Sequence, residues 1–139
     1  MAEAVVRWLE DGIFIGTDST QHSVVLSTEG EDGRVGMKSS ELLLVALAGC
    51  TAVDVVNILK KKRMPLEKLE IRVHGEQDSD PPWTYKKIHV TYELKGKGLT
   101  KQAVEQAIEL SETKYCSVSA SLRNQVEVGH DYILLDEGD

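Results

Sequence analysis

The feature that most restricts the fold is one long apolar stretch, Leu42 to Leu59. The segment from Glu41 to about Lys62 contains no Pro and one Gly, so we predict a helix of about six turns. Apolar residues occupy nearly every face of its first half, which is typical of a helix surrounded by protein. We therefore expect a long buried helix in the centre of the fold.

The ends of this helix carry recognisable signals. Ser39 or Ser40 is the expected N-cap, and Glu41 follows in the first turn, where a carboxylate suits the helix dipole. Met64 and Pro65 should end the helix, because the residue before a proline is disfavoured in the helical region.

The apolar stretch raises the question of a membrane span. It contains Asp54, which would cost roughly 3 kcal/mol near the middle of a bilayer, so a helix inside protein is the better interpretation. The N-terminus opens with Met1-Ala2-Glu3-Ala4 and has no cationic region followed by an apolar one. We expect a cytoplasmic protein without a membrane segment.

The flanking sequence predicts strands. Residues 4–9, 13–16 and 23–27 have strand character, with an Asp11-Gly12 turn between the first two, and residues 29–36 form a polar loop. Two longer segments, 69–75 and 88–94, alternate apolar and polar residues. This alternation predicts an antiparallel sheet with a helix on one face.

The C-terminal third predicts two helices and a closing strand. Thr100 is a good N-cap for a helix with an apolar stripe. The segment around Cys116 fits a short helix, although Val118, Ala120 and Leu122 also alternate as in a strand. Residues 126–134 are expected to form the strand that closes the sheet. The apolar stripe of the helix after Thr100 consists of Ala103, Val104, Ala107 and Ile108.

This element order predicts an α+β fold in a single domain over residues 1–139. One chain of this size has too few elements to cover a long apolar helix on all sides. A second copy would be the simplest cover, so we expect a homodimer.

Composition argues against some classes of function. A formal net charge of -7 and a pI of about 5.1 argue against nucleic-acid binding. The four histidines are scattered without the close pairs of zinc sites, so we expect no metal. Two cysteines, Cys50 and Cys116, are then either inert core thiols or a redox pair.

Two motifs resemble one known family. Residues 41–56, ELLLVALAGCTAVDVV, are similar to the central-helix motif of the OsmC/Ohr superfamily. Residues 112–118, ETKYCSV, resemble the motif around the second cysteine of that superfamily. The two cysteines lie 66 residues apart in a matching element order, and the resemblance covers nearly the whole chain. Residues 54–63 favour the YhfA-like branch.

The resemblance implies an OsmC-like fold, with antiparallel sheets around the central helix in an intertwined homodimer. It implies a thiol-dependent peroxidase in oxidative stress defence that reduces organic hydroperoxides or hydrogen peroxide without a cofactor. Cys50 would be the peroxidatic thiol and Cys116 the resolving thiol. Attack on the peroxide gives a sulfenic acid, which condenses with the second thiol to a disulfide. An external dithiol must then reduce that disulfide.

Local physics and the resemblance disagree on which thiol attacks. Cys116 would lie at a helix N-terminus beside Lys114, which lowers a thiol pKa, whereas Cys50 lies mid-helix among apolar residues. In the Ohr branch an arginine from the N-terminal strands activates the attacking thiol. Arg7 and Arg34 are the candidates here.

In that branch a glutamate at the start of the central helix holds the arginine. Its position, ten residues before the cysteine, is Ser40 in this chain, while Glu41 points about 100° away around the helix. Glu41 is therefore either the orienting carboxylate or a helix-end charge. The alternative function is a non-enzymatic dimer that holds a small apolar ligand in the same interface pocket.

Overall fold

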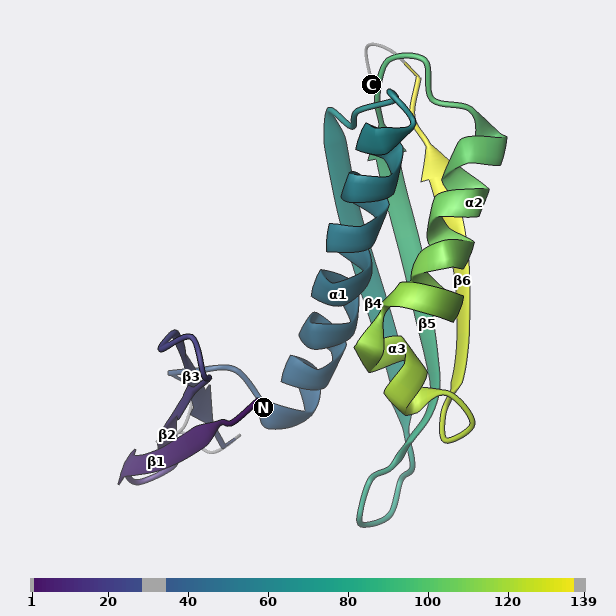
Figure 1. The fold of residues 1–139 in the computed structure, drawn as a ribbon. Helices are drawn as coiled ribbons and strands as arrows, with labels where there is room; N and C mark the ends of the chain where they lie inside the picture. The colour runs from purple at the N-terminus through teal and green to yellow at the C-terminus, as the bar shows by residue number, and fades with distance from the viewer. Residues whose placement is uncertain (1, 29–34, 137–139) are drawn as a thin grey trace. The chain divides into compact units, whose positions relative to one another are not determined.

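The computed structural model describes residues 2–28 and 35–136. It divides into two compact units, Met1–Leu43 and Leu44–Asp139, which are described in turn (Figure 1). The expectation of one domain over residues 1–139 stays a prediction.

The N-terminal unit contains an antiparallel three-stranded sheet in the order β1-β2-β3. Its strands are Val5–Glu10, Ile13–Thr17 and Ser23–Ser27, as the sequence predicted. Asp11 has a positive φ of 45° in the first turn, a conformation that Asp tolerates better than most residues. The predicted polar loop at 29–36 falls largely outside the described residues, and Arg34 is among the residues not described.

Helix α1, Ser39–Lys61, follows the apolar stretch. The first helical hydrogen bonds run to the carbonyl of Lys38, so both serines lie inside the helix and the expected serine cap is wrong. The C-terminal end is as predicted. Arg63 is left-handed, its N–H reaches the Lys60 carbonyl at 3.0 Å, and the Met64 N–H reaches the Leu59 carbonyl at 2.9 Å.

Within one chain, α1 is only partly buried, as expected for a chain with too few elements to cover it on all sides. Its buried residues form a single stripe, Leu47, Thr51, Val55 and Leu59. Val45, Val53 and Val56 are exposed large hydrophobic side chains on its other faces. By length and apolar composition this helix is also the one described helix that could span a membrane. The sequence pattern indicated an apolar surface around this helix, and the rest of the chain covers only part of that surface.

The C-terminal unit has a second sheet in the order β4-β5-β6. Its strands are Lys68–Gln77, Tyr85–Lys95 and Glu127–Leu134. Strands β4 and β5 are antiparallel as expected, but β6 runs parallel to β5, so the expectation of wholly antiparallel sheets is wrong. Parallel strands need a crossover connection, and the helices between β5 and β6 provide it.

Helices α1 and α2 cover the same face of this sheet (Figure 1). Side chains alternate across β5, so Ile88, Val90, Tyr92 and Leu94 are buried. The opposite face is polar. On it the exposed His89 Nε2 lies 2.8 Å from Asp131 Oδ1.

The crossover consists of three helical segments. Helix α2, Lys101–Leu110, starts at the predicted N-cap, where Thr100 Oγ1 accepts a 3.2 Å hydrogen bond from the Ala103 N–H. The stripe Ala103, Val104, Ala107 and Ile108 is buried as expected. A π-helical turn, η2 (Ser111–Tyr115), follows directly. The short helix α3, Ser117–Leu122, has Cys116 as its N-cap, which confirms the helical interpretation of this segment.

Candidate functional site

The two cysteine thiols are neighbours that come from two helical segments. Cys50 lies on α1, and Cys116 joins η2 to α3. Burial raises the pKa of Cys116 and the side chain of Cys50 raises it further, so the two thiols are close neighbours in the fold. Cys50 is half-buried and Cys116 is buried, and neither forms a disulfide. Two neighbouring thiols can form a disulfide once one of them is oxidised.

The environment of Cys116 differs from what its helix-end position predicts. Its sulfur accepts a 3.3 Å hydrogen bond from the Ser119 N–H, which lowers the thiol pKa. Burial outweighs this effect, and together with the neighbouring Cys50 side chain it raises the pKa of Cys116 to about 11. The side chain is 2% exposed. The expectation that Cys116 carries the lowered pKa is therefore wrong, because desolvation disfavours the thiolate more than the short helix stabilises it.

The turn that carries Cys116 is fixed to α1. The Cys116 N–H donates to the Ser111 carbonyl at 2.7 Å, which closes the π-helical turn. The buried Ser111 hydroxyl in turn donates to Asp54 Oδ2 at 2.8 Å. Asp54 lies one helical turn after Cys50, so this bond connects the turn of one cysteine to the helix of the other.

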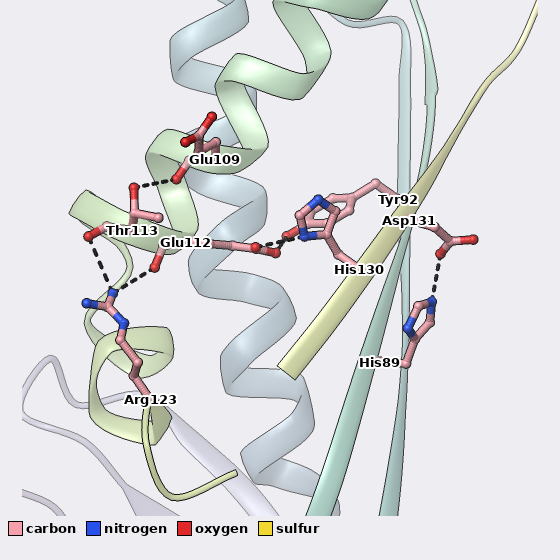
Figure 2. A network of polar contacts seen from close by, with 8 residues as sticks. All are labelled: His89, Tyr92, Glu109, Glu112, Thr113, Arg123, His130 and Asp131. Atoms are coloured by element: carbon pink, nitrogen blue, oxygen red, sulfur yellow. Dashed lines mark hydrogen bonds and ion pairs between the residues drawn. The ribbon is translucent and has the colours of Figure 1, made fainter. Parts of the chain in front are cut away.

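The same turn is fixed to the sheet through Glu112 (Figure 2). The Tyr92 hydroxyl on β5 donates to Glu112 Oε1 at 3.0 Å, and His130 Nδ1 on β6 lies 2.9 Å from Glu112 Oε2. Burial raises the pKa of Tyr92 above its ordinary range, and the negative charge of Glu112 raises it further, while a hydrogen bond with Thr51 opposes both. Tyr92 therefore remains a hydrogen-bond donor at physiological pH.

Arg123, the residue that follows α3, also binds the π-helical turn. Its Nη2 donates to the carbonyls of Glu112 at 3.0 Å and Thr113 at 3.4 Å (Figure 2). Sequence reasoning did not find Glu112, Tyr92 or His130 as a group. The position of Glu112 four residues before Cys116 was visible, but its partners lie 20 and 18 residues away on two strands.

The remaining two predicted site residues lie in the N-terminal unit. Arg7 is on β1, opposite Ile15 and exposed. It borders a surface hollow of about 380 Å³ together with Asp18 and other residues of that unit. Glu41 is in the first turn of α1, with its carboxylate 3.7 Å from Lys38 Nζ. The roles of Arg7 and Glu41 stay predictions.

Metal ligation has no evident place in the part of the chain that the structure describes. No group of three or more His, Cys, Asp or Glu side chains could hold a metal ion there.

Comparison with known proteins relates this arrangement to one family. The family of OsmC-like proteins matches residues 30–131. Protein YhfA of Escherichia coli K12 is 32% identical over 130 residues, which cover 94% of this chain and 96% of YhfA. A protein of Aquifex aeolicus VF5 is 28% identical with a TM-score of 0.82, over 98% of both chains.

A more distant structure shares the fold. The organic hydroperoxide resistance protein OhrB of Bacillus subtilis superposes with a TM-score of 0.65 at 17% identity, over 96% of this chain and 98% of OhrB. The match of the family over most of the chain, together with the similarity to YhfA, shows that this protein belongs to the OsmC family.

Proposed function

We propose that the protein is a thiol-dependent peroxidase in which Cys50 attacks the peroxide and Cys116 resolves the product. The observation that carries this proposal is that the two thiols are close neighbours, on segments joined by the bonds from Cys116 to Ser111 and from Ser111 to Asp54. Isolated core thiols need no neighbouring thiol, whereas a disulfide-forming pair does. OhrB of B. subtilis, which shares the fold, is named an organic hydroperoxide resistance protein, and the proposal extends that chemistry to this chain.

The roles follow from exposure and pKa. Cys50 is the more accessible thiol, so a peroxide reaches it first. Its thiolate attacks the distal oxygen, the O–O bond breaks, and the alkoxide leaves as an alcohol after taking a proton. Cys116, buried and largely protonated, is unsuited to the first attack.

The second step needs no further group from outside the pair. The Cys116 sulfur attacks the sulfur of the Cys50 sulfenic acid, the S–S bond forms, and the S–O bond breaks. The hydroxide leaves as water with the proton of Cys116. A small dithiol or dithiol protein in the cytoplasm would then return both cysteines to thiols.

The exposed apolar faces of α1 support a homodimer as the working form. Val45, Val53 and Val56 are exposed within one chain, and a shallow groove of about 350 Å³ borders the helix between Val45 and Ile71. Contiguous apolar surface of this kind is typical of an interface. A second copy is the partner that the proposal assigns to it.

The test compares single-cysteine variants with the parent. One equivalent of cumene hydroperoxide should remove both thiols of the parent. Cys116→Ser should react once and stop at a sulfenic acid that dimedone traps, and Cys50→Ser should be nearly inert. Reactivity of Cys50→Ser alone would reverse the roles, and equal slow oxidation of all three proteins would refute the peroxidase.

The apolar groove favours a second candidate, a dimer that binds a small apolar ligand without catalysis. Its lining is apolar, from Val45, Ala48 and Ala52 on α1 to Leu69 and Ile71 on β4. Slow thiol oxidation together with retention of an apolar fluorescent probe would favour this function.

A further inference from the structure

The turn that carries Cys116 is held by more polar contacts than a connection of this length requires. Ser111 binds Asp54 on α1, and the Glu112 carboxylate binds Tyr92 on β5 and His130 on β6. Figure 2 shows the Glu112 side chain extended from its helix to both partners at once. These contacts join the segment of the buried thiol to α1 and to two strands of the sheet.

The Glu112 carboxylate is the part of this set best placed to act on Cys116. Both of its oxygens are used, at 3.0 Å and 2.9 Å, and its side chain is 19% exposed. Hydrogen bonds that involve a carboxylate are about twice as strong as neutral ones. The tyrosine that it binds is fully buried, and Glu112 itself lies in the π-helical turn that the bond from the Cys116 N–H to the Ser111 carbonyl closes.

We propose that Glu112, held by Tyr92 and His130, is a positioning residue that keeps Cys116 against Cys50 and thereby sets the rate of the resolving step. The proposal rests on the proposed function, because it assigns residues to the second half of that reaction. Glu112 itself touches neither the peroxide nor the oxidised sulfur.

Position controls this step because it is intramolecular. Two groups held in reacting geometry behave as if present at very high effective concentration, and a displacement of about 1 Å can cost about a hundredfold in rate. Loss of the Glu112 contacts would free the π-helical turn from the sheet while Cys116 kept its backbone bond to Ser111. The thiol would then spend less time in line with the Cys50 sulfur.

The resolving step can be measured without any peroxide. 5,5′-Dithiobis(2-nitrobenzoate) transfers one thionitrobenzoate (TNB) to Cys50 and releases the other, which absorbs at 412 nm. Cys116 then attacks the Cys50 sulfur, the protein disulfide forms, and the second TNB leaves as a thiolate while the Cys116 proton passes to solvent. The first release reports access to Cys50, and the second reports the approach of Cys116.

The variants separate positioning from stability. Glu112→Ala and Tyr92→Phe should slow the second release about tenfold or more, with the first release within about twofold of the parent. Glu112→Gln keeps an acceptor for Tyr92 and should recover part of the rate. A matched control is Tyr132→Phe, because the Tyr132 hydroxyl also binds a glutamate, Glu105 on α2, at 2.6 Å.

A second control accounts for destabilisation. Val104→Ala removes buried volume in α2, which costs stability without touching the Glu112 contacts. If Val104→Ala or Tyr132→Phe slows the second release as much as Glu112→Ala does, the effect is general loosening and the proposal is overturned. An unchanged second release in both Glu112→Ala and Tyr92→Phe overturns it as well.

The outcome is distinct from that of the peroxidase test. A parent protein that releases the second TNB rapidly but ignores cumene hydroperoxide refutes the proposed function and leaves the positioning role supported. A parent protein that consumes peroxide, with Glu112 and Tyr92 variants that resolve at the parent rate, supports the proposed function and refutes the positioning role.

Discussion

The raised pKa of Cys116 predicts that this thiol alkylates slowly in the folded protein. At pH 7.4 a thiol with a pKa of about 11 is about 1 part in 4,000 thiolate, against about 1 in 40 for the ordinary value of 9.0. The hundredfold loss of thiolate is partly offset, because the nucleophilicity of a thiolate rises with pKa with a slope of about 0.4–0.5. This offset is about eightfold, so chemistry alone leaves the reaction about twelvefold slower.

Burial adds to this difference, since the side chain is 2% exposed. The assay follows iodoacetamide labelling of each cysteine by peptide mass spectrometry, in native protein and in 8 M urea as the reference. Cys116 should label more than tenfold more slowly in the native protein at pH 7.4, and its rate should rise about tenfold per pH unit through pH 9. A native rate equal to the rate in urea, or a plateau below pH 9, would refute the reasoning that burial controls this thiol.

Three further predictions concern other parts of the chain. Arg7→Ala should slow alkylation of Cys50 at neutral pH if Arg7 stabilises its thiolate. The control is Arg72→Ala, which removes an exposed arginine of β4 that pairs with Glu70 and should leave the rate unchanged. Equal rates in all proteins would remove Arg7 from the site. Sedimentation at micromolar concentration should give the mass of two chains, and a folded monomer would contradict the proposed dimer. Thr100→Ala should lower the free energy of unfolding by about 1 kcal/mol in urea titrations, because the α2 N-cap is lost, and an unchanged midpoint would show that water replaces the cap.

Local patterns were enough to place most of the elements. Alternation located β4 and β5, the apolar stripe located α2, and Thr100 marked its first turn. These features depend on residues close in sequence, so a single segment contains the information. The two cysteine motifs likewise located the candidate thiols.

The direction of β6 could not be predicted in the same way. Residues 127–134 have the same alternation in a parallel and in an antiparallel strand, so the pattern fixes the faces and leaves the direction open. The direction depends on where the crossover delivers the chain, and η2, which turns it, has no clear sequence signal.

The site was predictable only in part for a related reason. The pKa of Cys116 depends on burial by the rest of the fold, which outweighs the helix N-terminus that the local sequence displays. Glu112 binds Tyr92 and His130, which come from two different strands. Nothing in the sequence near Glu112 indicates these two partners.

The π-helical turn constrains how the sequence can change in length. The Cys116 N–H bonds a carbonyl five residues earlier, so η2 contains one residue more than an α-helical turn would. Deletion of any one residue between Ser111 and Cys116 would restore the α-helical spacing and rotate everything beyond it by about 100°. The thiol would then point away from α1, although every remaining side chain could be unchanged. Substitutions within this segment therefore keep the spacing of the turn, whereas single-residue deletions do not.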